Sequence, residues 1–295
     1  MAKGVAVLGA IVAVALLGAV GYGAWSYFRV KRVGVDLTDA ADSGPQNYLV
    51  VGSDSRARVD ESAAGAGAFG GREGATGQRS DSISIARIDP RSDRIDMLSI
   101  PRDLWLPIAG TGGKQRINTA YSRSTQTLID TVEQQLGVPV NHFVEVDFVG
   151  FQKLISAIGG VPMYFDHPVR DKNSGLRIVE RGCHVLDGYQ GLAFARSRHL
   201  EWNNGVRWVS DPSGDLGRMT RQQLLARAAL GRTRSMGLTD VGRLKGLVDA
   251  GLSSVSLDEA LGFDDVLGLS RRFAKFDPDR LQTHSLPVVG ARSSG

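Results

Sequence analysis

The chain has 295 residues, of which 42% are hydrophobic and 22% are charged, and its formal net charge at pH 7 is +4. These values are typical of a globular protein, and they exclude a chain that is disordered along its whole length. The single cysteine, Cys183, excludes a scaffold of intrachain disulfides and a zinc site built from several cysteines.

Residues 4–28 contain no charged side chain. A helix needs about 20 apolar residues to cross the hydrocarbon layer. The sequence therefore predicts an N-terminal tail and transmembrane helix over residues 1–28, with Trp25 and Tyr27 at the interface. A cleavable signal peptide is the alternative, but its apolar core is usually only about 7–15 residues long. The flanking basic residues do not decide the orientation, because the positive-inside rule weakens when a large domain follows.

After a linker over residues 29–46, the pattern of elements predicts one α/β domain over residues 47–295. A hairpin is expected in which Arg79 and Asp81 at its start lie beside Arg102 and Asp103 at its end. Strands are expected at 47–51, 83–88, 95–100 and 281–289, with a half-exposed strand between the first two helices. Helices are expected at 124–136, 149–158, 187–195, 216–230, 239–250 and 257–273, with a loop over the site at 205–217.

Charged residues stand beside small or apolar residues at several places in the chain. Asp54 and Asp81 both lie where a predicted strand meets a loop, the usual position of catalytic groups on a rigid scaffold. Two carboxylates without a nearby histidine or cysteine suit a hard cation such as Mg²⁺, which completes its shell with water and phosphate oxygens. Arginines provide planar, bidentate donors for phosphate, and the candidates are Arg79, Arg102, Arg196, Arg198 and Arg218.

Carboxylates, a metal ion and several arginines together are what a pyrophosphate requires. The ion bridges the two phosphates, and the guanidinium groups offset the charge that develops as a phosphorus–oxygen bond breaks. The alternative is an internal salt-bridge network in which the two aspartates neutralise the arginines. Such a network is costly to bury without a ligand, so the sequence favours a binding site.

Other catalytic classes are less well supported. The five histidines show no metal-ligand spacing. The turn GSDSR is not the G-x-S-x-G elbow of hydrolases, because Arg56 takes the place of the second glycine.

Six motifs occur in order: NYLVVGSDSR, RSDSISIARIDP, LSIPRDLWLPI, KQRINTAYS, GLAFARSRH and GDLGRMTRQQ. They resemble the LytR-CpsA-Psr family of membrane-anchored cell-wall enzymes, over residues 47–230. The resemblance implies a mixed three-layer α-β-α sandwich that encloses a hydrophobic tunnel for a polyprenyl chain, with the pyrophosphate at its mouth. It also implies transfer of a glycopolymer from a polyprenyl-pyrophosphate carrier to a muramyl hydroxyl of peptidoglycan, with pyrophosphatase activity as a side reaction.

The resemblance also implies roles for individual residues. Asp54 and Asp81 match the family's Mg²⁺-binding aspartates, with Mn²⁺ as an alternative ion. Asp103 is a candidate for the general base or for a residue that orients Arg102. The family's phosphate-binding arginines match Arg79, Arg102, Arg196 and Arg198, and its other polar headgroup residues match Asn118, Asp215, Arg218 and Gln222.

Two departures from the family are visible. The segment 182–218 resembles actinobacterial members, which often pair the cysteine equivalent to Cys183 with one in the preceding strand. Met163 takes the place of that partner, so this disulfide is not expected. The sequence also stops at Gly295 without the additional C-terminal domain that many actinobacterial members carry, so a single catalytic domain is expected.

The sequence therefore predicts a single-pass membrane enzyme with a cytoplasmic N-terminus and an extracytoplasmic catalytic domain. Its expected partners are a polyprenyl-pyrophosphate-linked glycopolymer, the peptidoglycan acceptor and membrane lipid. A membrane-bound transcriptional regulator is one alternative, but the basic patch at Arg227, Arg232 and Arg234 is better explained as a solvated face, so no nucleic-acid partner is expected. The second alternative is a non-catalytic polyprenyl-lipid-binding protein, which would lack the charged residues at the mouth of the tunnel.

Overall fold

The computed structural model describes residues 30–40, 44–53, 80–92, 94–235 and 255–287. The predicted transmembrane helix in residues 1–28 lies outside them. Within the described part of the chain, no helix is both long and apolar enough to cross a membrane.

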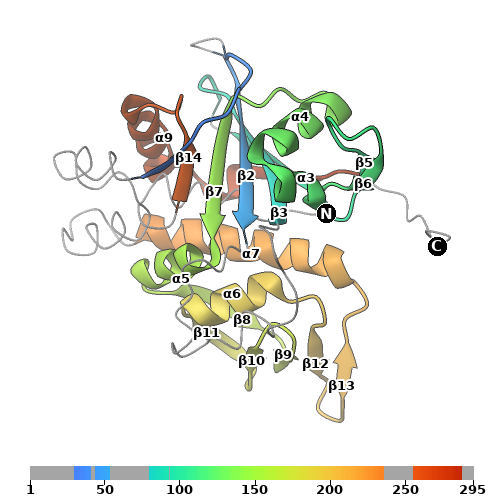
Figure 1. The fold of residues 1–295 in the computed structure, drawn as a ribbon. Coiled ribbons are helices and arrows are strands. Elements are labelled where there is room, and N and C mark those ends of the chain that lie inside the picture. The colour runs from blue at the N-terminus through green and yellow to red at the C-terminus, as the bar shows by residue number, and fades with distance from the viewer. Residues whose placement is uncertain (1–29, 41–43, 54–79, 93, 236–254, 288–295) are drawn as a thin grey trace.

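A mixed seven-stranded sheet forms the centre of the domain (Figure 1). In spatial order its strands are β1 (Lys31–Val33), β14 (Val255–Asp258), β7 (His142–Asp147), β2 (Gln46–Ser53), β3 (Ser80–Ile88), β4 (Ile95–Ile100) and β15 (Leu281–Ser285). The central strands β7 and β2 run parallel, whereas β3 is antiparallel to both β2 and β4. Ile83 lies opposite Ile100, which confirms the predicted hairpin.

Alternate residues of the central strands face two separate hydrophobic cores, as the two-residue period of a strand requires. Leu49 and Val51 of β2 pack with α3 (Asn118–Arg123) and α4 (Thr125–Leu136). Tyr48 and Val50 face the other core. That core is covered by α5 (Phe148–Ala157), α6 (Gly188–Arg196), α7 (Gly214–Ser235) and α9 (Phe263–Lys275). Helices on both faces of a mixed sheet confirm the predicted α/β class and its three layers.

Side chains that precede three of these helices cap them. Ser124 Oγ accepts a hydrogen bond from Thr127 N at 2.9 Å at the start of α4. Asp147 accepts one from Gly150 N at 2.7 Å at the start of α5, and Asp187 caps α6 in the same way. Because Asp147 also ends β7, this strand passes directly into α5, and the helix starts at the carboxyl edge of the sheet.

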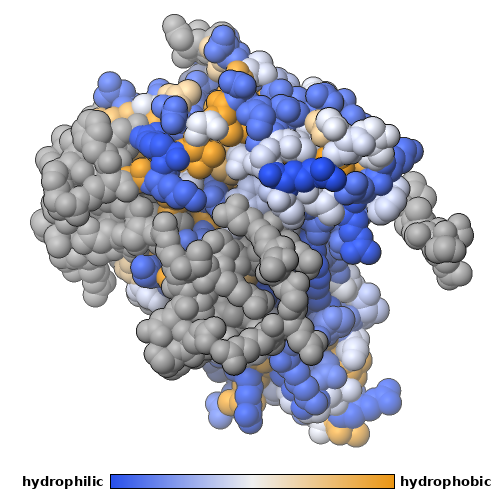
Figure 2. Space-filling view, in the orientation of Figure 1, coloured by the Kyte–Doolittle hydropathy of each residue, from blue (hydrophilic) through white to orange (hydrophobic). Residues whose placement is uncertain are grey.

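Smaller sheets extend the domain beyond the helical layers. The largest has the order β10 (Leu176–Ile178), β9 (Val169–Asp171), β12 (Glu201–Asn203) and β13 (Trp208–Ser210). Two further pairs are β8 (Val161–Phe165) with β11 (Gly182–Leu186), and β5 (Trp105–Pro107) with β6 (Lys114–Arg116). Hydrophilic side chains predominate among the described residues on the face shown in Figure 2.

Several predictions about individual elements are wrong. Strand β7 is not half exposed, because it lies between β2 and β14 and both of its faces are covered. Residues 205–217 are not one continuous loop, since they include β13 and the beginning of α7. The helix predicted at 257–273 begins only at Phe263, because the preceding residues form β14. The helix predicted at 239–250 lies outside the described residues.

The segment predicted to be a linker, residues 29–46, contributes to the domain. It contains β1, which pairs in parallel with β14 at the edge of the central sheet. Thr38 N donates a hydrogen bond to Val140 O at 3.0 Å, so the chain after β1 also contacts the domain. The folded unit therefore begins before residue 47.

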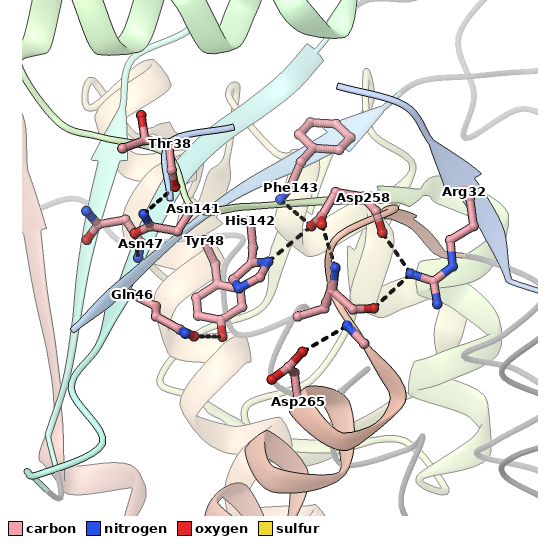
Figure 3. Close-up of polar contacts among 12 residues, drawn as sticks. Arg32, Thr38, Gln46, Asn47, Tyr48, Asn141, His142, Phe143, Asp258 and Asp265 are labelled. Atoms are coloured by element: carbon pink, nitrogen blue, oxygen red, sulfur yellow. Dashed lines mark hydrogen bonds and ion pairs between the residues drawn. The ribbon is translucent and has the colours of Figure 1, made fainter. Parts of the chain in front are cut away.

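A buried polar network joins β1, β7 and β14 at this edge (Figure 3). The Asp258 carboxylate accepts hydrogen bonds from Phe143 N (2.9 Å) and Leu261 N (2.7 Å) and lies 3.4 Å from His142 Nδ1. Arg32 Nη1 donates to the carbonyl oxygens of Asp258 and Leu261 at 2.7 and 2.9 Å. The hydrogen bonds to the Asp258 carboxylate satisfy buried polar groups that would be costly to leave unpaired, and those from Arg32 hold β1 against the sheet.

Tyr48 is the aromatic part of this network. Its ring stacks on His142 with 4.8 Å between ring centroids, and its hydroxyl donates a hydrogen bond to Gln46 Oε1 at 2.6 Å. Burial, together with the neighbouring charges of Asp265 and Asp258, raises the pKa of Tyr48 well above the usual range of a phenol. The hydroxyl therefore stays protonated and remains a donor.

The strand pair β8–β11 places Cys183 differently from the sequence prediction. Tyr164, rather than Met163, lies opposite Cys183, and Met163 pairs with His184. Cys183 is exposed and carries a free thiol.

Candidate active site

A cavity of about 330 Å³ lies at the carboxyl ends of β2 and β7, between the sheet and helices α5, α6 and α7. Gly52, Val146 and Asp147 line it from the two strands. In Figure 1 the arrowheads of β2 and β7 point toward α7, which contributes residues to the same cavity. Ligands of open α/β sheets bind at this edge, so the cavity is the candidate site.

The lining of the cavity changes from charged to apolar along two of the helices. Along α7 the side chains change from Arg218 and Gln222 to Leu225, Ala226 and Ala229, and along α6 from Arg196 back to Leu192. Helix α5 adds further apolar lining, namely Phe148, Phe151 and Ile155. The cavity therefore has a charged part and a hydrophobic part joined in one space.

The β3–β4 hairpin contributes to the charged part. Because Ile83 lies opposite Ile100, Ser82 at the start of β3 and Arg102 just after β4 come close together, and both line the cavity. The prediction that the two ends of the hairpin lie side by side is confirmed for the described residues. Arg102 O also accepts a hydrogen bond from Asn118 N at 3.1 Å, which ties the end of the hairpin to the start of α3.

Two of the predicted arginines share one carboxylate. Asp215 Oδ1 lies 2.9 Å from Arg218 Nη2 and 3.3 Å from Arg198 Nε. The Arg218 side chain is only 4% exposed. A guanidinium group buried to this extent needs a nearby negative charge, and Asp215 provides one. Asp215 therefore orients the two arginines without lining the cavity itself.

Two further contacts fix the end of α6. The Arg196 guanidinium lies over the Phe148 ring, 4.6 Å from its centroid, so the cation is held between α5 and α6. Gln222 Nε2 donates a hydrogen bond to Ala195 O at 2.9 Å and so connects α7 to the last turn of α6. Both side chains remain part of the cavity wall.

Asp171 is a cavity residue that sequence reasoning misses. It is 1% exposed, and its Oδ2 accepts hydrogen bonds from Ser197 Oγ (2.7 Å), Arg198 N (2.9 Å) and His199 N (2.8 Å). Its Oδ1 accepts two more, from the backbone N–H groups of residues 173 and 174. One carboxylate thus holds the segment that follows α6 and carries Arg198. No sequence motif points to Asp171, because it is a single aspartate in a strand of only three residues.

The same contacts decide the charge of Asp171. Burial alone would raise its pKa, but the hydrogen bonds from Ser197, His199, Asn173 and Ser174 lower it more, so the pKa lies below the ordinary value of a carboxyl group. Asp171 is therefore an anion at neutral pH, when it accepts all of these hydrogen bonds.

Some predicted site residues lie beside the cavity rather than in its wall. Asp103 is exposed and lies 3.7 Å from Arg102 Nε and 3.6 Å from Arg116 Nη1. Asn118 Oδ1 is buried, and no described group donates a hydrogen bond to it. Neither residue lines the cavity. Asp54 and Arg79 lie outside the described residues, as does the side chain of Asp81.

The strand register places the backbone of one of the two predicted metal-binding residues. Gly52 pairs with Ser82 and Ser53 with Ser80, with a bulge between the two pairs, so the Asp81 position lies beside the end of β2. Asp54 follows Ser53 directly in the chain. Bulges of this kind commonly redirect side chains next to active sites. Within the described part of the chain, no group of three or more histidine, cysteine and acidic side chains could hold a metal ion.

Comparison of the chain with known proteins assigns it to one family. The chain belongs to the LytR_cpsA_psr family, whose model matches residues 27–295. This match agrees with the resemblance that the ordered motifs indicate.

Individual relatives support the same assignment. The chain is 29% identical, over 275 residues, to the polyisoprenyl-teichoic acid–peptidoglycan teichoic acid transferase TagU of Halalkalibacterium halodurans, covering 88% of this chain and 81% of the relative. It is 31% identical over 215 residues to the transferase TagV of Bacillus subtilis, covering 70% of this chain and 51% of TagV. Among solved structures, a LytR-Csp2A-Psr enzyme from Actinomyces oris is similar with a TM-score of 0.69 and 26% identity, covering 90% of each chain.

Proposed function

We propose that the protein is a phosphotransferase that attaches a glycopolymer from a polyprenyl-pyrophosphate carrier to peptidoglycan during cell-wall assembly. The observation that carries this proposal is the cavity, in which an arginine-lined part continues into a hydrophobic part. A pyrophosphate on a hydrocarbon chain has the same two-part chemistry, because the arginines suit the phosphates and the apolar side chains suit the hydrocarbon. The relatives TagU and TagV are named as transferases of this class.

In the proposed reaction, a muramyl hydroxyl of peptidoglycan attacks the phosphorus that carries the sugar. A new phosphorus–oxygen bond forms to the acceptor, and the bond to the bridging oxygen of the pyrophosphate breaks. Polyprenyl phosphate leaves with that oxygen, and the hydroxyl proton passes to a base or to water. Water in place of the acceptor gives pyrophosphatase activity as a side reaction.

The arginines of the cavity act on the charge that this reaction moves. Arg102, Arg198 and Arg218 bind the phosphate oxygens and stabilise the negative charge that builds up on the leaving phosphate. Arg196 is held by Phe148 at the junction of the charged and apolar parts, so it suits the phosphate nearest the hydrocarbon. Arg79 would join this set from the start of the hairpin.

Asp103 and Asn118 take supporting roles in the proposal. The exposed Asp103 carboxylate lies beside Arg102 and outside the cavity wall, which favours orientation of Arg102 over the role of general base. The backbone N–H of Asn118 donates a hydrogen bond to Arg102 O, so Asn118 helps to fix the same arginine. Its side-chain Oδ1 is buried.

Asp54 and Asp81 would hold Mg²⁺, or Mn²⁺, with their carboxylates. When bound, the ion supplies positive charge to the phosphate oxygens of the substrate. Two carboxylates at the meeting point of β2 and β3 suit this ion because hard cations prefer oxygen ligands.

The proposal includes a single-pass anchor in residues 4–28, a cytoplasmic N-terminus and a catalytic domain outside the cytoplasm. The uncharged length of this segment supports the anchor, and β1 follows it almost at once. Cysteine labelling with a membrane-impermeant reagent tests the topology. Cys183 is exposed and should react in intact cells, whereas a domain on the cytoplasmic side would be protected until lysis.

Substitution of Arg102 tests the proposed chemistry. The full-length protein should release phosphate from geranylgeranyl pyrophosphate, and Arg102→Ala should slow this release by roughly a hundredfold, since loss of one charge-stabilising donor commonly costs that much. Arg91→Ala is the matched control, because Arg91 lies in the β3–β4 turn at the opposite end of the hairpin. Equal rates for wild type and Arg102→Ala would rule out the proposed site, and tight binding without turnover would favour the non-catalytic lipid-binding alternative.

A further inference from the structure

A second groove lies on the outer face of the four-stranded sheet β10–β9–β12–β13. Its volume is about 510 Å³, and its polar and aromatic lining includes Arg170, Lys172, Arg177, Asn203 and Trp208. It adjoins the active-site cavity along the chain, since Lys172 lines the groove and the next residue, Asn173, lines the cavity. Asp171 lines both spaces, so the groove and the active-site cavity are neighbours.

The groove concentrates positive charge in an unfavourable arrangement. Arg177 of β10 lies directly opposite Arg170 of β9. Like charges directly opposite each other on neighbouring strands destabilise a sheet. Glu201 forms an ion pair with Arg170, with 2.6 Å between Oε2 and Nε, and the Asp171 carboxylate also lines the groove. Because Lys172 adds a third cation to Arg170 and Arg177, the positive charges still exceed the two carboxylates by one. An anion bound between the strands would relieve the excess of positive charge.

The remaining polar lining suits a sugar chain. The Arg170 guanidinium is stacked over the Trp208 ring, 4.1 Å from its centroid, which holds its donors in place. Asn203 Oδ1 accepts a hydrogen bond from Gly205 N at 2.8 Å, and this orients the side-chain amide, whose N–H groups are donors. One aromatic ring, one side-chain amide and two arginines in the same groove match the hydroxyls and acidic groups of a carbohydrate.

We propose that this groove binds an anionic glycan, a sugar chain that carries carboxylates or phosphates, next to the site of phosphoryl transfer. The inference rests on the proposed function, and it names the part of a substrate that extends beyond the pyrophosphate. Two glycans of the proposed reaction carry such charges: the polymer on the lipid carrier, and the acceptor strand with its carboxylate-bearing peptides. The groove thus selects for negative charge on the glycan.

Binding by the full-length protein tests this proposal without turnover. Calorimetry is performed with three probes: a phosphate-bearing glycopolymer fragment, a disaccharide muropeptide, and neutral chitotetraose. At least one anionic probe should bind, and chitotetraose should bind about tenfold more weakly or not at all. Arg177→Glu should weaken the anionic probe by about tenfold or more, and Arg177→Gln should weaken it less.

Arg91→Glu is the matched control, because it changes the net charge equally on an exposed arginine at the β3–β4 turn. The anionic probe that binds more weakly to Arg177→Glu than to wild type identifies the glycan. Weaker binding of the polymer fragment indicates the glycan on the carrier, and weaker binding of the muropeptide indicates the acceptor. Equal binding by wild type, Arg177→Glu and Arg91→Glu, or equal binding of neutral and anionic probes, overturns the proposal.

Turnover of geranylgeranyl pyrophosphate separates this proposal from the proposed function. That substrate carries no glycan, so Arg177→Glu should release phosphate from it at the wild-type rate. If the wild type itself releases no phosphate, the proposed function is wrong. The calorimetry then still decides whether the groove binds an anionic glycan.

Discussion

Asp171 connects the small four-stranded sheet to the arginines of the active site. Its carboxylate accepts hydrogen bonds from Ser197 Oγ and from the backbone of Arg198 and His199, so the path of the chain after α6 depends on one buried anion. We expect Asp171 to act as a positioning residue, because its oxygens are occupied by these donors.

Asp171→Asn tests this role. The substitution keeps the size of the side chain but directs an NH₂ group at N–H donors, and we expect it to lower the free energy of unfolding by about 1–3 kcal/mol. It should also slow phosphate release, mainly through kcat, because Arg198 is displaced. Asp187→Asn is the control, since Asp187 is exposed and asparagine is an equally good helix cap. Identical thermal unfolding and kcat for the two variants would show that Asp171 has no such role.

The lowered pKa of Asp171 adds a pH dependence to the same comparison. A carboxyl group with a depressed folded-state pKa stabilises the protein above its unfolded pKa of about 3.9, and this contribution is lost as the pH falls through the folded-state pKa. The difference in melting temperature between wild type and Asp171→Asn should therefore be constant from pH 7 to 5 and shrink below about pH 4. A difference that stayed constant down to pH 2.5 would contradict the assigned ionisation.

At the scale of elements, the contact between α5 and α6 depends on a glycine. A Cβ atom added at Gly188 would meet the backbone carbonyl oxygen of Gln152 and lie 2.7 Å from Ser156 Oγ. The two helices can approach this closely only without a side chain at this position. Their spacing matters for function because α5 carries Phe148 and α6 carries Arg196, which contact each other at the cavity.

Gly188→Ala should force α5 and α6 apart, destabilise the protein by about 1–3 kcal/mol and reduce phosphate release. Gly231→Ala in α7 is the matched control, because an added Cβ meets no described atom within 4 Å there. Alanine in that open helical position should leave stability unchanged or raise it by roughly 1 kcal/mol. Thermal unfolding of both variants measures the difference, and equal melting temperatures would argue against close packing at Gly188.

The elements that could be predicted from the sequence are those with a long, regular pattern. The alternating run in β3 and the turn after Ile88 predict the hairpin, and the capping residues Ser124, Asp147 and Asp187 precede helices that the structure contains. Strands of three residues, such as β9 and β10, are too short for periodicity to reveal. The burial of β7 was misjudged because a strand's neighbours in a sheet cannot be predicted from its own residues.

At the scale of the whole molecule, the arginines of the site could be predicted from the sequence, whereas the residues of its hydrophobic part could not. Arg102, Arg196, Arg198 and Arg218 were selected by residue type and motif, and the fold brings all of them to one cavity. The hydrophobic half arises where three helices meet, so Ala226 and Ala229 acquire their role only through packing. The groove with Arg170 and Arg177 likewise depends on a strand register that the sequence does not reveal.

The central claim is that a single cavity holds both the pyrophosphate and the hydrocarbon chain of the substrate. A crystal structure of the full-length protein with geranylgeranyl pyrophosphate tests it most directly. The account predicts phosphate oxygens within hydrogen-bonding distance of Arg102, Arg198 and Arg218, with the hydrocarbon extending between α5 and α7 past Phe151 and Ala229. Phosphates bound away from these arginines, or a hydrocarbon chain lying outside the cavity, would contradict the account.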